Sequence, residues 1–321
     1  MTEKPRLLIT RKLPDAVEGR AAQDYQTTTN PDDVQFDADD LVQRCEGMDA
    51  VMCCSSEEFD AGVIARLPDT LKMVATYSVG FDHIDLEAAR ARGLIVTNTP
   101  GVLTDATADV TMLCILGAAR QAHEAASVLR AGRWARWEAT AMLGVDLEGK
   151  RLGILGMGRI GQTVARRARA FDMEIHYHNR RRLAPDEELG ATYHESAEAM
   201  LPEVDILSLN CPLSAETHHF LDSRRIGLLK DGAIVVNTSR GPVVDDSALI
   251  AALRSGKVRA AGLDVFEGEP QINPAYLELP NAFLLPHIGS ATVETRNAMG
   301  FKCLDNLDAW FSGQEPPDRL A

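Results

Sequence analysis

Three side chains that could do proton and anion chemistry follow apolar runs expected to be strands: Arg240, Glu269 and His287. Residues placed after parallel strands meet at one edge of the sheet, where ligands bind in open α/β folds. An imidazole can deliver a proton near neutral pH, and a carboxylate beside it favours the protonated ring. A guanidinium can hold a substrate carboxylate and polarise a carbonyl. Any one of them could be structural, but together they predict hydride transfer to a 2-keto acid, with His287 as the acid.

The same half of the chain contains a motif for a hydride carrier. Gly156-Met-Gly-Arg-Ile-Gly161 stands between an apolar segment, Arg151–Leu155, and a helical pattern over Gln162–Phe171. In a strand, turn and helix of this kind, glycines allow the tight turn and the close approach of a pyrophosphate to the helix N-terminus. The run therefore predicts a dinucleotide site with contacts from Gly156, Gly158, Arg159, Ile160 and Gly161.

The next strand indicates which dinucleotide is preferred. An acidic residue about 20 positions after the glycine turn normally accepts the ribose 2′-hydroxyl of NAD. Here Asn179 stands at that place, and Arg180 and Arg181 follow it. Arginines suit a 2′-phosphate, so we expect NADP(H) to be preferred and NAD(H) to bind more weakly. The alternative is that both arginines form a solvated surface run, with weak NAD binding and no preference.

Strands and helices alternate along the whole sequence, which predicts parallel sheets covered on both faces. The expected strands before the glycine turn are Arg6–Thr10, Ala50–Cys54, Met73–Thr76 and Gly93–Thr97. Those from the turn onward are Leu152–Leu155, Glu174–Tyr177, Ile206–Leu209, Ala233–Asn237, Ala260–Asp264 and Phe283–Leu285. A final helix over Thr292–Phe311 must pack back on an earlier part of the chain.

The fold class expected is therefore α/β, with two doubly wound parallel-sheet domains. A Rossmann nucleotide-binding domain, residues 100–287, is inserted in a discontinuous flavodoxin-like substrate domain, residues 1–99 and 288–321. Between the strands of the first domain and the glycine turn, the apolar spacing over Ala106–Leu129 predicts one helix. This helix is apolar on more than one face, so we expect it to be buried between domains or subunits. Trp134 and Trp137 follow it in a connection that either anchors a loop or belongs to an interface.

Composition excludes several classes of function. A chain of 321 residues is long for one core, and a net charge of -14 argues against a nucleic-acid partner. No apolar run reaches the roughly 18 residues of a membrane span, and the N-terminus lacks the pattern of a signal peptide, so a cytoplasmic protein is expected. The six cysteines are scattered without the spacing of metal ligands; we expect reduced thiols and no metal.

These motifs together resemble the D-isomer specific 2-hydroxyacid dehydrogenase family over nearly the whole chain. The resemblance rests on Gly156–Gly161, Asn237–Asp245, Gly262–Pro270 and Leu285–Thr292, with Ser78–Asp85 in support. It implies catalysis by Arg240, Glu269 and His287. It implies substrate contacts from Val79, Gly80, Arg240, His287, Ser290 and Trp137. It implies further cofactor contacts from Thr107, Cys211, Pro212, Thr217, Thr238, Ser239, Arg240, Asp264, His287 and Gly289. A homodimer formed through the nucleotide-binding domains is also implied, in which Trp137 can reach the neighbour's site. From the residues alone, the turn at Val79 and Gly80 is equally well a simple tight turn or a carboxylate site.

Within that family the sequence is most similar to the NADPH-dependent glyoxylate/hydroxypyruvate reductases. Phosphoglycerate dehydrogenases carry an arginine after an early strand to meet a phosphate, whereas Cys53-Cys54-Ser55-Ser56 stands there in this chain. A small, unphosphorylated 2-keto acid is therefore the expected substrate. Two alternatives remain: a reductase for a bulkier 2-keto acid, such as a keto-sugar acid or phenylpyruvate, and a dinucleotide-sensing protein like the corepressors that share this fold.

Overall fold

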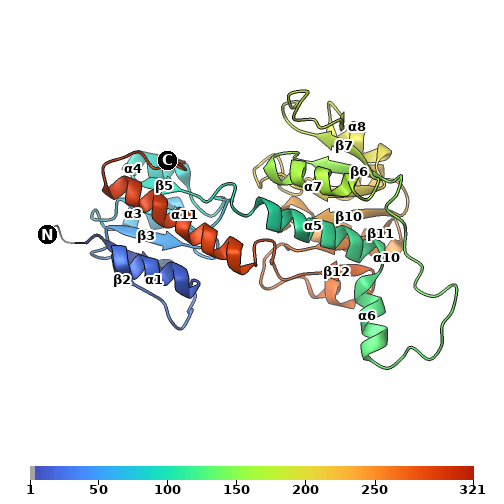
Figure 1. Ribbon diagram of the computed structural model, residues 1–321, viewed down its shortest axis with the longest axis horizontal. Helices are drawn as coiled ribbons and strands as arrows, with labels where there is room; N and C mark the ends of the chain where they lie inside the picture. Colours follow the sequence, from blue (N-terminus) through green and yellow to red (C-terminus); the bar gives the residue numbers. More distant parts are fainter. Residues whose placement is uncertain (1–3) are drawn as a thin grey trace. The chain divides into compact units, whose positions relative to one another are not determined.

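The computed structural model describes residues 4–321, which form two compact units (Figure 1). The first unit holds the chain up to Leu103 together with Ser290–Ala321, and the second holds Thr104–Gly289. The chain therefore leaves the first unit once and returns to it at its end. Among residues 4–321, no helix is both long enough and apolar enough to cross a bilayer.

The described part of the first unit contains a sheet of five parallel strands in the order β2-β1-β3-β4-β5. Its strands are β1 (Arg6–Ile9), β2 (Gln26–Thr28), β3 (Ala50–Cys53), β4 (Met73–Thr76) and β5 (Ile95–Thr97). This 2-1-3-4-5 order is that of a flavodoxin-like doubly wound sheet. The strands β3, β4 and β5 are buried throughout, as expected for a sheet covered on both faces.

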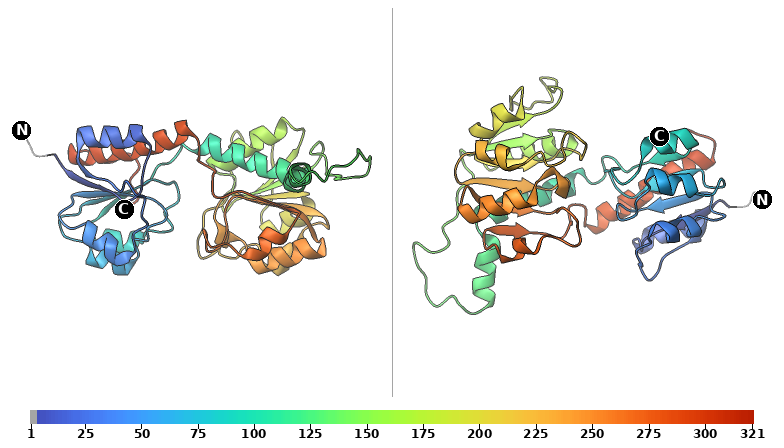
Figure 2. Two further views of the ribbon diagram at one scale, coloured as in Figure 1. Left: turned by 90° about the horizontal axis from the view of Figure 1, so that it is seen from below. Right: turned by 180° about the vertical axis from the view of Figure 1, so that it is seen from behind.

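Helices cover both faces of this sheet (Figure 2). On one face lie α1 (Asp15–Asp24) and α11 (Val293–Phe311); the other carries α2 (Ala38–Arg44), α3 (Ala61–Arg66) and α4 (Leu86–Arg92). The helix α11 packs closely on α1, because a Cβ at Gly300 would come within 2.4 Å of the Val17 side chain. The last helix of the chain is thus part of the first unit.

The second unit, all of whose residues are described, is built on seven parallel strands in the order β12-β11-β10-β9-β6-β7-β8. They are β6 (Arg151–Leu155), β7 (Glu174–His178), β8 (Thr192–Tyr193), β9 (Ile206–Leu209), β10 (Ala233–Asn237), β11 (Val258–Leu263) and β12 (Ala282–Leu284). Counted within the unit, the order is 3-2-1-4-5-6 with a seventh strand added at one edge, which is the Rossmann arrangement. The predicted fold class is confirmed.

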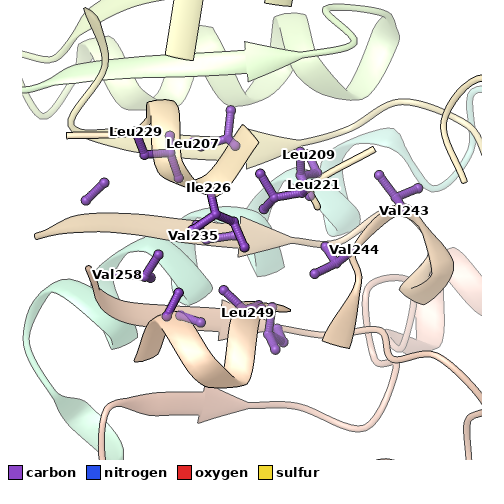
Figure 3. Packing of buried hydrophobic residues seen from close by; sticks show 14 of the residues in the cluster. Leu207, Leu209, Leu221, Ile226, Leu229, Val235, Val243, Val244, Leu249 and Val258 are labelled. Carbon is purple, nitrogen blue, oxygen red and sulfur yellow. The ribbon is translucent and has the colours of Figure 1, made fainter. Parts of the chain in front are cut away.

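Two apolar layers hold the second unit together. On one face α5 (Thr104–Ala119) and α7 (Arg159–Arg169) pack on the sheet; on the other lie α8 (Ala197–Met200), α9 (Ser223–Leu228) and α10 (Asp246–Ser255). Figure 3 shows the second layer, where Leu207, Leu209 and Val235 of the strands meet the residues that follow. These are Leu221, Ile226, Leu229, Val243, Val244, Leu249 and Val258. Three short 3-10 turns complete the unit: η1 (Leu201–Glu203), η2 (Gly241–Val243) and η3 (Pro274–Glu278).

The structure corrects the prediction of a single helix over Ala106–Leu129. The helix α5 ends at Ala119, and a separate helix, α6 (Ala122–Arg130), begins after Gln121, whose φ of 50° breaks the helical path. Only α5 is buried; none of the residues of α6 is. A continuous apolar pattern does not show a change of direction when the break depends on one residue in a left-handed conformation.

The sequence also missed two edge strands. β2 is three residues of Gln and Thr, and β8 is only two residues long. Neither has the buried apolar run that predicted the central strands, because edge strands are often short and polar. The second sheet consequently has one strand more than the six expected.

Candidate active site

The glycine turn lies at the point where the order of the second sheet reverses. β6 pairs with both β7 and β9, and ligands bind in crevices at such switch points. Gly156 follows β6 with a φ of 91°, and a Cβ there would come within 2.7 Å of the Cys211 backbone nitrogen. A Cβ at Gly161 would come within 2.6 Å of the Gly156 carbonyl oxygen. Both positions therefore require glycine, and they bring the turns after β6 and β9 against the start of α7.

The middle glycine of the run has a different environment. A Cβ at Gly158 would meet nothing within 4 Å, and Gly158 caps α7 without a side-chain hydrogen bond. The N–H groups of the first turn of a helix have no partner inside the helix and favour an anion. Open space beside these groups fits the pyrophosphate of a dinucleotide, which here would contact Gly158, Arg159 and Ile160.

Asn179 is tied to the glycine turn. Its Oδ1 accepts a hydrogen bond of 2.6 Å from the backbone N–H of Met157, so the end of β7 is held beside the turn. Arg180 and Arg181 are exposed and have no hydrogen-bond or ion-pair partner within residues 4–321. Arg182 differs, because it pairs with Glu188 at 2.6 Å and its guanidinium lies over the ring of Tyr193. Two of the three arginines are thus available for a ligand.

Buried polar groups gather where the nicotinamide is expected. The Asp264 carboxylate, 1% exposed, accepts hydrogen bonds of 2.8 Å from the N–H groups of Ile288 and Gly289. Burial raises the pKa of Asp264, and these two N–H groups act against that rise. A Cβ at Gly289 would lie 3.1 Å from Asp264 Oδ2 and 3.5 Å from Thr107, so Thr107 of α5 lies at the same place.

Other predicted cofactor residues lie on neighbouring turns. Thr111 of α5 and Thr238 after β10 share a buried hydrogen bond of 2.8 Å. In the loop after β9, which starts with Cys211, the Thr217 hydroxyl donates to the Pro212 carbonyl oxygen at 2.7 Å. These contacts fix the loops after β9 and β10.

Backbone hydrogen bonds align the ends of three neighbouring strands. The Asp264 N–H donates to the Asn237 carbonyl oxygen at 3.0 Å, and the His287 N–H donates to the Asp264 carbonyl oxygen at 2.8 Å. His287 itself has a φ of 51°. Non-glycine residues adopt this conformation rarely, and such residues cluster at ligand sites.

His287 and Glu269 form a close pair. His287 Nδ1 lies 2.5 Å from Glu269 Oε1, and Glu269 Oε2 accepts from the Phe266 N–H at 3.2 Å. The side chains are 41% and 33% exposed, so both remain accessible to a substrate. Because Nδ1 donates to the carboxylate, Nε2 is the imidazole nitrogen left to exchange a proton with a ligand.

Arg240 is positioned by the turn that contains it. The Asn237 side chain donates to the Arg240 carbonyl oxygen at 2.9 Å and accepts from the Ser239 N–H at 3.0 Å. At Gly241, a Cβ would come within 1.8 Å of the Phe266 carbonyl carbon. The turn with Arg240 therefore packs directly on the loop that leads to Glu269. The sequence did not single out Asn237, although an Asn before a Ser-Arg-Gly-Pro turn is a signal for side-chain bonds of this kind.

The first unit contains the turn at Val79 and Gly80. Asn98 donates from Nδ2 to the Val79 carbonyl oxygen at 2.8 Å, and the Ser78 hydroxyl donates to that of Gly80. Neither the Val79 nor the Gly80 N–H donates to any acceptor in the described chain. Successive N–H groups without partners suit a carboxylate. Ser290 also belongs to the first unit.

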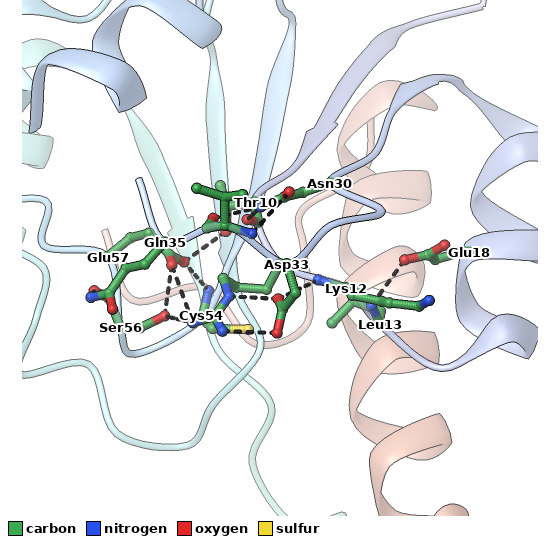
Figure 4. A network of polar contacts seen from close by, with 12 residues as sticks. Thr10, Lys12, Leu13, Glu18, Asn30, Asp33, Gln35, Cys54, Ser56 and Glu57 are labelled. Atoms are coloured by element: carbon green, nitrogen blue, oxygen red, sulfur yellow. Dashed lines mark hydrogen bonds and ion pairs between the residues drawn. The ribbon is translucent and has the colours of Figure 1, made fainter. Parts of the chain in front are cut away.

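A buried carboxylate organises the neighbouring turn after β3 (Figure 4). Glu57 is 1% exposed and accepts hydrogen bonds from the hydroxyls of Thr10 and Ser56, at 2.7 and 2.6 Å, and from the Cys54 N–H at 3.0 Å. Arg11 beside it is engaged by Asp33 through two hydrogen bonds of 2.8 and 3.0 Å. The guanidinium of Arg11 beside this turn is therefore already paired.

Comparison with known proteins identifies the family. Residues 112–289 match the family described as D-isomer specific 2-hydroxyacid dehydrogenase, NAD binding domain. The chain belongs to this family. As a D-2-hydroxyacid dehydrogenase it is an oxidoreductase that binds a nicotinamide dinucleotide, and the resemblance found in the sequence is confirmed.

Relatives of this dehydrogenase match over nearly its full length. It is 42% identical to a glycerate dehydrogenase from Hyphomicrobium methylovorum, over 99% of each chain. It is also 42% identical to a glyoxylate reductase from Thermococcus litoralis, over 98% of this chain and 96% of that one. A crystal structure of an NADPH-dependent glyoxylate/hydroxypyruvate reductase from Sinorhizobium meliloti, in complex with NADP and malonate, has a TM-score of 0.90. It is 36% identical and matches over 99% of this chain and 97% of that chain.

The second unit of this dehydrogenase thus brings together most of the residues predicted to act in the site. The exceptions are Val79, Gly80 and Ser290, which belong to the first unit, and Trp137, which is 78% exposed in the loop after α6.

Proposed function

We propose that the protein reduces small 2-keto acids of the glyoxylate and hydroxypyruvate type to D-2-hydroxy acids, with NADPH as the preferred cofactor. The observation that carries this proposal is the contact of 2.5 Å between His287 and Glu269, beside the buried Asp264 and on the sheet that carries the glycine turn. The names of the relatives from Hyphomicrobium methylovorum and Thermococcus litoralis support a substrate of this class.

The residues of the chain bind and orient the substrate and transfer the proton. The bound cofactor supplies a hydride to the carbonyl carbon. As negative charge develops on the carbonyl oxygen, His287 Nε2 delivers the proton that completes the hydroxyl group. Glu269 holds Nδ1 and stabilises the imidazolium before transfer, and the partly exposed ring then regains a proton from solvent. Arg240 binds the substrate carboxylate and polarises the carbonyl. Within the first unit, the N–H groups of Val79 and Gly80 have no acceptor in the described chain and suit a carboxylate.

The preference for NADP(H) rests on the residues after β7. Asn179 replaces the acidic side chain that would repel a 2′-phosphate, and its side-chain oxygen Oδ1 already accepts a hydrogen bond from the Met157 N–H. The exposed Arg180 and Arg181 offer planar donors for that phosphate. NAD(H) lacks the phosphate and is expected to bind more weakly.

A small, unphosphorylated substrate is supported by the turn after β3. This turn presents Cys54 and serines, and Glu57 within it is buried and fully used by neighbouring donors. The guanidinium of Arg11 is held by Asp33, so it is not available to neutralise a substrate phosphate. The first unit is accordingly proposed as the substrate domain.

A homodimer formed through the second unit is supported by α6 and the loop after it, which extend beyond the sheet of that unit in Figure 1. None of the residues of α6 is buried, and five large apolar side chains in this segment are exposed: Leu129, Trp134, Trp137, Met142 and Leu143. Exposed apolar groups gathered in this way are typical of an interface. The six cysteines are free thiols, which agrees with the cytoplasmic location proposed here.

The test is an initial-rate panel of 2-keto acids of increasing size, each measured with NADPH and with NADH. The expected result is the highest kcat/KM for glyoxylate or hydroxypyruvate with NADPH. A higher value for phenylpyruvate or a keto-sugar acid would overturn the assignment of a small substrate. No oxidation of either cofactor with any 2-keto acid would instead indicate a dinucleotide-sensing protein.

A further inference from the structure

A cluster of metal-ligating side chains lies in the second unit, apart from the residues assigned to hydride transfer. His218 and His219, in the loop after β9, and Glu267, in the loop after β11, each offer one ligand atom, and these atoms lie within 4.8 Å of one another. The rings of the two histidines are stacked, with centroids 4.1 Å apart. Two imidazoles and one carboxylate from two separate loops therefore converge on one point.

The backbone around the histidines is fixed. His219 has a φ of 47°, and its N–H donates to the Pro242 carbonyl oxygen at 2.7 Å. Two residues later, the Leu221 N–H donates to the Val243 carbonyl oxygen at 3.0 Å. The loop is thus fastened to the segment after Arg240, and the main chain that carries both rings is restrained.

The carboxylate comes from an equally restrained loop. Gly241 packs on the Phe266 and Glu267 backbone so closely that a Cβ would come within 2.3 Å of the Glu267 nitrogen. Glu267 Oε1 lies 2.9 Å from His219 Nε2. Ligand atoms about 2.0–2.1 Å from a tetrahedral zinc ion lie about 3.3 Å apart, so this pair already has nearly the spacing that a metal ion needs.

The local charge favours a cation. Burial raises the pKa of Asp246 to about 6, and the negative charges of Glu267 and Asp245 contribute to that rise. The side chains of His219 and Glu267 are 38% and 40% exposed, so an ion can reach them from solvent. A divalent ion bound to Glu267 would partly neutralise the negative charges of Glu267 and Asp245.

We propose that His218, His219 and Glu267 form a binding site for one divalent transition-metal ion such as Zn²⁺ or Co²⁺. Imidazole nitrogen with a single carboxylate suits these ions, whereas Mg²⁺ and Ca²⁺ prefer sets of oxygen ligands. On binding, His219 Nε2 exchanges its hydrogen bond to Glu267 for the metal, and the ring proton moves to Nδ1. Water completes the coordination. The ion joins the loop after β9 to the loop that also carries Glu269, and so restrains a part of the active site. The spacing of the cysteines predicted no metal site, and the site proposed here uses none of them.

The experiment measures binding of the metal alone to the full chain, purified without a histidine tag and treated with a chelator. Calorimetric titration with ZnCl₂ and the visible absorption of added CoCl₂ should both give one ion per chain. His218→Ala and Glu267→Gln should weaken the binding at least tenfold, and circular dichroism should show unchanged folding.

Two control variants identify competing sites. His123→Ala removes an exposed histidine of α6, and His287→Ala removes the other close pair of a histidine and a glutamate. Both should retain the stoichiometric ion. The proposal is overturned if no ion binds to the unaltered chain, if His218→Ala and Glu267→Gln bind as the unaltered chain does, or if His287→Ala alone abolishes binding.

Discussion

Replacing Gly158 by Ala separates cofactor binding from folding at the glycine turn. Gly158 has a φ of -84°, which any residue can adopt, and an added Cβ would meet no protein atom within 4 Å. The protein should therefore fold normally. Because alanine is a poorer N-cap than glycine, we expect the free energy of unfolding to fall by no more than about 1 kcal/mol.

Binding of the cofactor should respond much more strongly. The open space at Gly158 is where the pyrophosphate would approach the first turn of α7, and a methyl group fills it. We expect the Kd for NADPH to rise at least tenfold, which corresponds to about 1.4 kcal/mol. Fluorescence titration with NADPH measures the Kd, and urea denaturation of the same preparations measures the stability.

Gly156→Ala is the matched control. Its Cβ would come within 2.7 Å of the Cys211 nitrogen at a φ of 91°, so this variant should lose about 2–4 kcal/mol of stability. If Gly158→Ala bound NADPH as tightly as the unaltered protein, the turn would not be the pyrophosphate site. Equal losses of stability in Gly156→Ala and Gly158→Ala would show that the space beside Gly158 is not open.

Three further variants test the cofactor preference, the acid and the buried carboxylate. Replacing Arg180 and Arg181 by Ala should weaken the binding of NADPH at least tenfold more than the binding of NADH. The control is Arg182→Ala, at an arginine held by Glu188, which should leave the ratio of the two Kd values unchanged. Equal losses of affinity for the two cofactors in the double variant would contradict the 2′-phosphate assignment. His287→Ala should lower kcat by about 10²–10⁴-fold with the Kd for NADPH unchanged, and normal turnover would exclude it as the acid. Burial raises the pKa of Asp246 to about 6, above its value in the unfolded chain. Between about pH 4 and 6 the folded state therefore binds more protons than the unfolded state, and the protein loses stability as the pH rises through that range. The variant Asp246→Asn lacks this loss. Its free energy of unfolding relative to that of the unaltered protein, measured by urea denaturation, should grow by on the order of 3 kcal/mol from pH 4 to 7. A difference between the two proteins that stays constant with pH would contradict the raised pKa.

Much of the fold follows from local patterns in the sequence. The central strands are short, continuously apolar runs, and the spacing of helical patterns between them requires parallel pairing. The glycine run could be placed correctly at a strand-to-helix turn because Gly156 and Gly161 have separate steric reasons to be glycine, and Gly158 leaves open space beside the helix. These signals belong to single segments, so no information about distant contacts was needed.

The features that sequence reasoning missed depend on contacts between distant segments. The break between α5 and α6 depends on the conformation of Gln121, which apolar periodicity does not report. Asn237 organises the turn that contains Arg240 through side-chain hydrogen bonds, and His219 meets Glu267 only because their loops follow β9 and β11, the strands on either side of β10. The alternation of strands and helices does indicate candidate site residues at the strand ends, but it does not show which of their side chains are in contact.

The packing of Gly241 on the Phe266 backbone has a consequence for how this enzyme can evolve. A larger residue at position 241 would push the turn that contains Arg240 away from the loop that leads to Glu269, so we expect single substitutions there to be disfavoured. If the proposed function holds, new substrate ranges would have to arise by changes elsewhere, in the turns after β3 and β4 of the proposed substrate domain. Arg240 and the loop of Glu269 would then be inherited together, while the choice of substrate could diverge.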